Sequence, residues 1–370
     1  MRLQPGTALL YGLLRIAQRL DRRARDATDF DPATVRRLLL VSTTALGDTV
    51  MSTAGIRALR RRYPRAHITA LLHPINGRLL AHSQDIDERL FYAGRYDRFL
   101  PTLRELRRRR FDVAAVFHGN EPQMTPLLYL AGIPFIFKLP NLSRYRFLLS
   151  NRELVLGWPQ IGHGLRQRLA VAQLAGAESD DPRMHLDIDD AQRASVLDAL
   201  QTKDIAVDTP LVGFQAGASS RRRAWPATRF AELGRTLTEH RPGTRIVLTG
   251  SPAERELCAG IARDIGPAAV SLAGELDIEA LPALISHMKV LVTGDTGTMH
   301  VAVAVRTPTV CLFGASDPAG AGPIYDLDRH TLIVKPWDAE ARKLVEPMAR
   351  IDVDEVRAAV ETTLDRHTAD

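Results

Sequence analysis

The 370-residue sequence predicts an α/β protein with two domains, each built on a doubly wound parallel sheet. Two observations lead to this fold class. The chain is longer than one ordinary hydrophobic core supports, which favours two domains. Short apolar runs typical of buried parallel strands alternate with segments of helical spacing, in two series separated by a charged stretch. Strands that alternate with helices in this way favour right-handed crossovers between parallel strands.

The composition is that of a soluble globular protein, with 45% hydrophobic, 25% charged and 6% aromatic residues, which excludes a disordered or fibrous chain. Two cysteines, Cys258 and Cys311, are too few for a disulfide framework or a closed zinc site and favour a reducing, cytoplasmic compartment. No apolar run reaches the roughly 18–20 residues of a transmembrane helix. Basic residues exceed acidic ones by 49 to 43, and only five of the 49 are lysine. This arginine bias reflects either genome composition or a surface facing anionic partners such as phosphates, carboxylates or an acidic membrane.

Residues 1–35 are expected to form an N-terminal extension with an amphipathic helix. The segment is not a signal peptide, because arginines interrupt its apolar run and it has no small-residue cleavage site. The helix is either an interfacial membrane anchor or an ordinary helix packed on the protein. At 100° per residue, one face carries Leu9, Leu10, Leu13, Ile16, Ala17 and Leu20, and the opposite face carries Arg15, Arg19, Arg22 and Arg23.

The first domain is expected over residues 36–185. Its first strand is predicted at 35–41, and a helix over 51–62 is predicted to end at Tyr63-Pro64, where proline stops it. Further strands are predicted at 67–72 and 111–117.

The charged, apolar-poor sequence from about 178 to 208 is expected to form a helix and a linker, with the linker over 186–208. A second domain is expected over 209–345 and a C-terminal segment over 346–370. The second domain's strands are predicted at 210–215, 245–250, 290–293 and 309–314, and a terminal helix within 351–370. Two such domains facing one another create a cleft at the carboxyl ends of both sheets, where ligands of such sheets bind.

Asp48 is the first candidate for chemistry. It lies in the loop Thr44-Ala45-Leu46-Gly47-Asp48-Thr49, between the first strand and its helix. At the mouth of a cleft its carboxylate is suited to act as general base for an incoming hydroxyl. The alternative is that Asp48 caps a helix that starts near Thr49. The loop carries neither a dinucleotide fingerprint nor a P-loop.

The second candidate is the segment 215–226, which follows the first strand of the second domain. Small residues there expose backbone N–H groups, hydroxyls add donors, and Arg221, Arg222 and Arg223 supply positive charge. This combination suits a diphosphate. A solvated arginine turn is the alternative.

The third candidate is the segment 293–300, which precedes an apolar helix. Two glycines and several hydroxyls present a helix N-terminus, which favours anions. Asp295 either orients the loop or accepts from a sugar hydroxyl, and His300 either donates to a phosphate or is structural. Glu254, at another strand end, either holds ribose hydroxyls or is an ordinary acid in a helix's first turn.

No metal site is expected, because the Asp-x-Asp segments 85–87, 187–189 and 352–354 are interpreted as turns or helix starts.

Taken together, these motifs resemble glycosyltransferase family 9, the lipopolysaccharide heptosyltransferases. The resemblance covers roughly residues 36–365. It rests on 45–53 with 56–60 and Tyr63-Pro64, on Gly217-Ala218 with Arg223-Ala224-Trp225-Pro226 and 230–233, and on 294–302 continuing through 307–309 to 312–318. Residues 111–113 and 348–356 are also similar.

The resemblance implies a GT-B fold of two Rossmann-like domains, with the acceptor in the first, the nucleotide sugar in the second, and the terminal helix packed back on the first. It also implies inverting, metal-independent transfer in which Asp48 takes the proton of the acceptor hydroxyl. Glu254 would contact ribose, and Asp295 would lie by the sugar or phosphate. The implied donor-binding set is Gly217, Ser219, Ser220, Arg223, Glu254, Asp295, Thr296, Gly297, Thr298, Met299 and His300.

The favoured donor is ADP-heptose and the favoured acceptor an inner-core lipopolysaccharide sugar, in the cytoplasm or on the cytoplasmic face of the inner membrane. No cofactor, metal or nucleic-acid partner is expected. The sequence departs from the family pattern at Arg223, where a lysine is usual, at Ala216, where a proline is usual, and in the N-terminal extension. Three alternatives stay open: a relative that uses another nucleotide sugar for O-antigen, capsule or another glycan; a catalytically silent nucleotide-sugar-binding subunit; and a nicotinamide dehydrogenase, which the missing glycine fingerprint disfavours.

Overall fold

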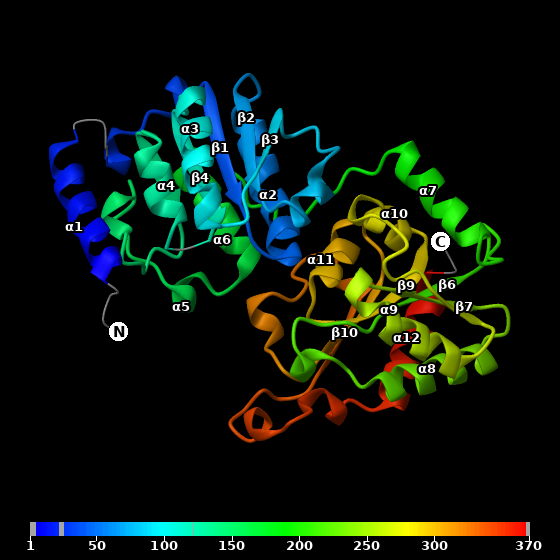
Figure 1. Cartoon of the computed structure of the whole chain (residues 1–370). Coiled ribbons are helices and arrows are strands. Elements are labelled where there is room, and N and C mark those ends of the chain that lie inside the picture. The colour runs from blue at the N-terminus through cyan, green and yellow to red at the C-terminus, as the bar shows by residue number, and fades with distance from the viewer. Residues whose placement is uncertain (1–4, 22–25, 121, 368–370) are drawn as a thin grey trace. The chain divides into compact units, whose positions relative to one another are not determined.

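The protein folds into two compact units, Met1–Pro182 and Arg183–Asp370, each around one all-parallel sheet. A computed structural model describes residues 5–21, 26–120 and 122–367 (Figure 1). The predicted fold class, α/β with two Rossmann-like parallel-sheet domains, is confirmed.

The sheet of unit 1 has the strand order β3-β2-β1-β4-β5. Every neighbouring pair is parallel, as the crossover connections require. The strands are β1 (Arg37–Ser42), β2 (His67–Leu72), β3 (Glu88–Phe91), β4 (Val113–His118) and β5 (Phe135–Lys138). The α-helices are α1 (Pro5–Leu20), α2 (Leu46–Arg62), α3 (Phe99–Arg109), α4 (Met124–Leu130), α5 (Trp158–Ile161) and α6 (Gly164–Leu174).

Two pairs of helices cover the sheet of unit 1. Helices α2 and α6 pack against each other and contact β4, whereas α3 packs against α4. Leu39 and Val41 of β1 share a buried cluster with Leu103 of α3 and Leu127 of α4. Alternate strand residues therefore face the α3–α4 layer, which leaves the other face of the sheet to α2 and α6.

Helix α1 packs on unit 1 through one side and exposes part of its apolar face. Leu14 is 3% exposed. The Tyr11 ring lies 5.4 Å from that of Phe147, and the Arg15 guanidinium lies over the Phe147 ring at 4.5 Å. Three apolar side chains predicted for the apolar face remain exposed: Leu13, Ile16 and Leu20. Leu9 and Leu10 have no described side chains, and Arg22 and Arg23 lie outside the described residues.

The sheet of unit 2 has the strand order β11-β10-β9-β6-β7-β8, again all parallel. The strands are β6 (Leu211–Gln215), β7 (Arg245–Thr249), β8 (Ala269–Ser271), β9 (Met288–Gly294), β10 (Thr309–Phe313) and β11 (His330–Val334). The α-helices are α7 (Asp190–Gln201), α8 (Ala227–His240), α9 (Arg255–Ile265), α10 (Leu281–Ser286), α11 (Gly297–Ala304) and α12 (Val353–His367). Helices α8, α9 and α12 form one contacting group and α7, α10 and α11 another.

One expectation for unit 2 needs correction, and it concerns the terminal helix. The helix expected in the charged segment before the second sheet is α7, which packs on α10, and Gln192 of α7 donates to the Glu279 carbonyl at 2.5 Å. The terminal helix α12, expected to pack on the first domain, packs instead on α8 and on β9, β10 and β11. Val356 and Val360 are completely buried in the core of unit 2, so this helix covers part of the second sheet.

Candidate active site

The strand orders locate one switch point in each sheet. In unit 1 the chain leaves β1 in one direction to β2 and later returns to the other side of β1 with β4. In unit 2 the equivalent adjacent pair is β6 and β9. Ligands of open parallel sheets bind outside the carboxyl ends of strands at such a point. Asp48 follows β1 and His118 ends β4, while the segments 215–226 and 294–300 begin at the last residues of β6 and β9.

Asp48 lies in the first turn of α2 and does not cap it. The helix begins at Leu46, and its N-cap residue is Ala45. The alternative that Asp48 caps a helix starting near Thr49 is therefore wrong. Its carboxylate accepts instead from the Arg168 guanidinium, Nη2 to Oδ1 at 2.7 Å, and from the Thr44 hydroxyl, Oγ1 to Oδ2 at 2.9 Å. The Asp48 side chain is 21% exposed, so solvent or a ligand can reach it.

His118 completes this cluster from β4. Its Nδ1 lies 2.8 Å from the Thr44 hydroxyl and 3.9 Å from Asp48 Oδ2. If the Thr44 hydroxyl donates to Asp48, then its oxygen accepts the hydrogen bond from His118 Nδ1–H, which leaves Nε2 as the unprotonated nitrogen of a neutral ring. The cluster thus joins a carboxylate, a hydroxyl, an imidazole and a guanidinium from four segments of unit 1.

The electrostatics of this cluster favour an ionised Asp48. Burial alone raises the pKa of this carboxyl, but the Arg168 charge, His118 and the Thr44 hydrogen bond outweigh it and hold the pKa below its usual value. Burial lowers the pKa of His118, against the pull of the nearby Asp48 charge. Asp48 is therefore a carboxylate at neutral pH, ready to accept a proton.

Arg168 and His118 were not predicted as site residues from the sequence. His118 carried a usable signal, because it is a polar residue directly after an apolar strand, at the edge where ligands bind. Arg168 carried none. It is one arginine among many, and only the packing of α6 on α2 brings it to Asp48.

A pocket of about 400 Å³ in unit 1 includes His118 among its lining residues. Its wall is largely apolar, and Leu142 and Trp158 are 67% and 47% exposed. Exposed apolar side chains beside a polar cluster suit the faces of a sugar ring.

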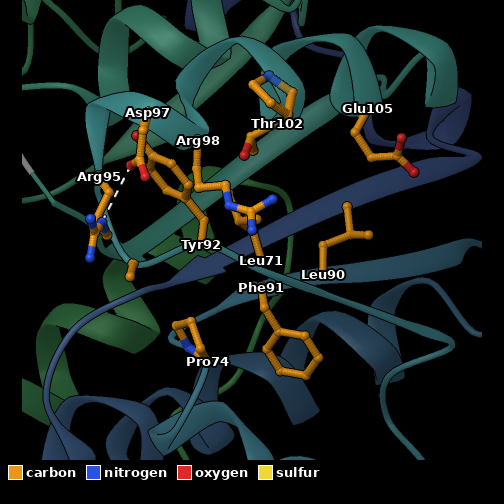
Figure 2. Close-up of a pocket in the computed structure, with 12 residues that line it drawn as sticks. Leu71, Pro74, Leu90, Phe91, Tyr92, Arg95, Asp97, Arg98, Thr102 and Glu105 are labelled. Carbon is orange, nitrogen blue, oxygen red and sulfur yellow. Dashed lines mark hydrogen bonds and ion pairs between the residues drawn. The ribbon is translucent and has the colours of Figure 1, made fainter.

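A larger pocket of about 710 Å³ lies in unit 1 between the end of β3, the following loop and α3 (Figure 2). Its wall combines apolar residues with charged ones. Figure 2 shows Arg98 among the lining residues, its guanidinium directed away from the ion pair that Arg95 makes with Asp97. That guanidinium has no ion pair or hydrogen bond with any residue that the structure describes, so it can bind an anion.

In unit 2, Glu254 lies directly against Gly217. A Cβ added at Gly217 would lie 1.6 Å from Glu254 Oε1, so any larger residue at this position would displace the Glu254 carboxylate. The carboxylate is held by the Ser251 backbone N–H at 2.7 Å and by the Ser251 hydroxyl at 2.9 Å, both to Oε2. Two loops that the sequence analysis treated separately therefore meet at the carboxyl ends of β6 and β7.

The three consecutive arginines divide between two roles. Arg221 pairs with Glu346 at 2.8 Å, and Arg222 donates to the Arg342 carbonyl at 2.7 Å. Arg223 alone turns to the end of β9, where its Nη2 lies 3.1 Å from Asp295 Oδ2. Of the three arginines, Arg223 is therefore the one that lies at the loop after β9, and its side chain is 41% exposed.

The N-terminus of α11 lies beside this ion pair. Thr296 is the N-cap residue, and its side chain makes no capping hydrogen bond. Its hydroxyl lies 3.1 Å from that of Thr293, and the Thr298 hydroxyl donates to Gln215 Oε1 at 3.1 Å. Met299 is fully buried and His300 is 6% exposed, so Met299 offers a ligand its backbone only. Gly297 is the first helical residue.

Ser219 and Ser220, in the segment after β6, are exposed, and their hydroxyls bond to no described residue.

Within residues 5–21, 26–120 and 122–367, no three His, Cys, Asp or Glu side chains come together in a group that could hold a metal ion. Both cysteines are free and buried. Burial raises the pKa of Cys258 to about 11 and that of Cys311 to about 12, so neither is a thiolate at neutral pH.

Two Rossmann-like units, each with a polar cluster at its switch point, define a protein of the GT-B class. Residues 100–350 match the model of glycosyltransferase family 9 (heptosyltransferase). The chain belongs to this family and is a glycosyltransferase, which confirms the resemblance.

Lipopolysaccharide heptosyltransferases of two bacteria are similar to this chain over most of their length. Lipopolysaccharide heptosyltransferase 2 of Salmonella typhimurium is 28% identical over 317 residues, covering 78% of this chain and 85% of the relative. The protein of that name from Escherichia coli is 27% identical over 309 residues, with the same coverage.

Solved structures share the fold. The glycosyl transferase family 9 protein from Veillonella parvula superposes with a TM-score of 0.75 at 21% identity, covering 90% of this chain and 97% of that one. The E. coli ADP-heptose lps heptosyltransferase II also gives 0.75, at 23% identity, covering 90% and 99%.

Proposed function

We propose that this protein transfers heptose from ADP-heptose to a sugar hydroxyl of a lipopolysaccharide core, with inversion and without a metal ion. The observation that carries the proposal is an ionised carboxylate, Asp48, held at the switch point of unit 1 in a chain of family 9. The similarity to lipopolysaccharide heptosyltransferases supports the donor and acceptor class.

In the proposed reaction, the acceptor binds to unit 1 and its hydroxyl donates to Asp48. The hydroxyl oxygen attacks the anomeric carbon while Asp48 takes its proton. The bond between that carbon and the diphosphate oxygen breaks on the opposite face, and ADP leaves with the electron pair. Asp48 then returns its proton to solvent. The pockets beside His118 and Arg98 support binding of a sugar and of an anionic group by this unit.

The donor binds to unit 2 in this proposal. Arg223, the hydroxyls of Ser219 and Ser220 and the N-terminus of α11 stabilise the charge that develops on the diphosphate, so no metal is required. Glu254 accepts from the ribose hydroxyls, and Asp295 holds Arg223 in place until the diphosphate arrives.

The proposal is tested with a panel of nucleotide sugars. ADP-heptose should raise the melting temperature more than UDP- or GDP-sugars, and ADP release should follow when a heptose-deficient lipopolysaccharide core is added. Transfer should persist in EDTA. Release of a nucleotide other than ADP would show that the donor is a different nucleotide sugar. Loss of transfer in EDTA that Mg²⁺ restores would contradict the metal-free mechanism.

Replacing Arg223 by alanine should weaken ADP binding by about 10- to 100-fold, because a charge-assisted contact with the diphosphate is lost. Calorimetric titration with ADP measures the effect. Arg221→Ala is the matched control: it removes an arginine two positions away whose surface pair with Glu346 contributes little, and ADP affinity should stay near wild type. Equal losses in both variants would show that the whole turn matters rather than Arg223.

We also propose that the exposed apolar face of α1 binds the surface of an anionic membrane. Within the described residues, no helix is long and apolar enough to cross a bilayer. Leu13, Ile16 and Leu20 are nevertheless 56%, 60% and 77% exposed, and Arg19 lies in the last turn of the helix. An apolar face next to cationic side chains is typical of interfacial helices.

Changing Leu13, Ile16 and Leu20 together to serine should abolish sedimentation with vesicles that contain anionic lipid. The protein should stay folded, because these side chains are exposed in the free protein. Val207→Ser, at an apolar position of unit 2 that is 70% exposed, is the control and should bind like wild type. Unchanged sedimentation of the triple variant would assign α1 to packing alone.

A further inference from the structure

We propose that Arg168 is a positioning residue for the transfer reaction: its buried guanidinium fixes one oxygen of Asp48 and keeps the carboxylate ionised, so that its free lone pairs accept the acceptor's proton. The inference rests on the proposed role of Asp48 as base. Arg168 acts through Asp48 and does not itself contact the substrate.

Burial makes this pairing compulsory. The Arg168 side chain is 1% exposed, and Asp48 is the only carboxylate among the described residues that pairs with it. Its remaining described contacts are weak: Nη1 donates to the Gly164 carbonyl at 3.3 Å, and Nε has no hydrogen-bond partner. A buried guanidinium cannot lose its proton, so it needs a nearby anion.

Close packing of two helices brings the guanidinium to Asp48. A Cβ at Gly164 of α6 would lie 2.7 Å from Met51 Sδ of α2. A Cβ at Gly55 of α2 would lie 2.5 Å from the Phe117 ring and 3.0 Å from the Arg168 carbonyl oxygen. The absence of side chains at these two positions lets α6 approach α2, so Arg168 reaches the first turn of α2 from the protein interior.

The groups around Asp48 divide its two oxygens between them. Arg168 holds Oδ1, while Thr44 and His118 lie on the side of Oδ2. Lys138 of β5 acts on His118 through its charge. Of these groups, Arg168 alone is a permanent cation in contact with the carboxylate. Without it, burial dominates and the pKa of Asp48 rises.

The experiment is the pH profile of kcat/KM for transfer by the full-length chain. The active form is the ionised one, so activity is present above the pKa of Asp48 and is lost as pH falls through it. In Arg168→Met the acid limb should move to higher pH by about one to three units, with donor KM unchanged. Arg168→Gln, which keeps an amide donor without the charge, should show the same shift. Arg168→Lys keeps the charge and should leave the limb near its wild-type position.

Arg166→Met is the matched control, since Arg166 is an exposed arginine of the same helix. The acid limb of the pH profile of this variant should stay at the wild-type pH. Melting curves identify any variant that fails to fold. An unmoved acid limb in a folded Arg168→Met or Arg168→Gln protein overturns the inference. If Asp48→Asn instead retains wild-type activity, the proposed base itself fails, and the two failures are thereby distinguished.

Discussion

Replacing Asp48 by asparagine is expected to lower kcat for transfer by about 10²- to 10⁴-fold, the usual contribution of a general base. Asparagine keeps the size of the side chain but cannot take a proton at neutral pH. ADP affinity should stay near wild type, because the proposed donor contacts all lie in unit 2. Single-turnover transfer at saturating donor and acceptor measures the loss.

Asp354→Asn provides a matched control, because Asp354 is also an acid in the first turn of a helix but is 89% exposed. Its turnover should equal that of the wild type. An Asp48→Asn enzyme that turns over at the wild-type rate would remove Asp48 from the mechanism and make His118, which shares its cluster, the next candidate.

The parts of the fold that were predictable are those whose signal is local. Strand β2 was predicted at its observed limits, and β6 within one residue, because buried parallel strands read as apolar runs. β3, β5, β8 and β11 were not predicted. They are three to five residues long and lie at or near the sheet edges, where the apolar run is short. Helix α2 begins five residues earlier than predicted, because Leu46 and Gly47 already belong to its first turn.

The candidate site shows the same division. Asp48 and the loops after β6 and β9 were found because strand ends in α/β sheets are recognisable in sequence. Its partners are set by tertiary packing: Arg168 is 120 residues away along the chain, and His118 reaches Asp48 only because β4 lies beside β1. Similarly, a terminal helix was predicted within 351–370, but no local pattern shows which sheet such a helix covers.

The ion pair between Asp48 and Arg168 implies a second large effect, on the stability of the protein. Asp48→Asn leaves the buried Arg168 without its counterion and is expected to lower the free energy of unfolding by about 3 kcal/mol, the lower end of the range for breaking a buried pair because Asp48 is partly exposed. Urea denaturation, read as the shift of the midpoint at constant slope, measures it. The wild-type advantage should shrink in acid, since a carboxylate with a lowered folded-state pKa stabilises above its unfolded pKa and loses that contribution as pH falls.

Removing both charges separates stability from catalysis. In Asp48→Asn/Arg168→Met the uncompensated charge is gone, so much of the lost stability should return, whereas transfer should stay as low as in Asp48→Asn. Strictly additive losses in the double variant would mean that the two residues stabilise unit 1 independently. Recovered stability without recovered turnover would show that the low turnover of Asp48→Asn comes from the lost carboxylate and not from the lost stability.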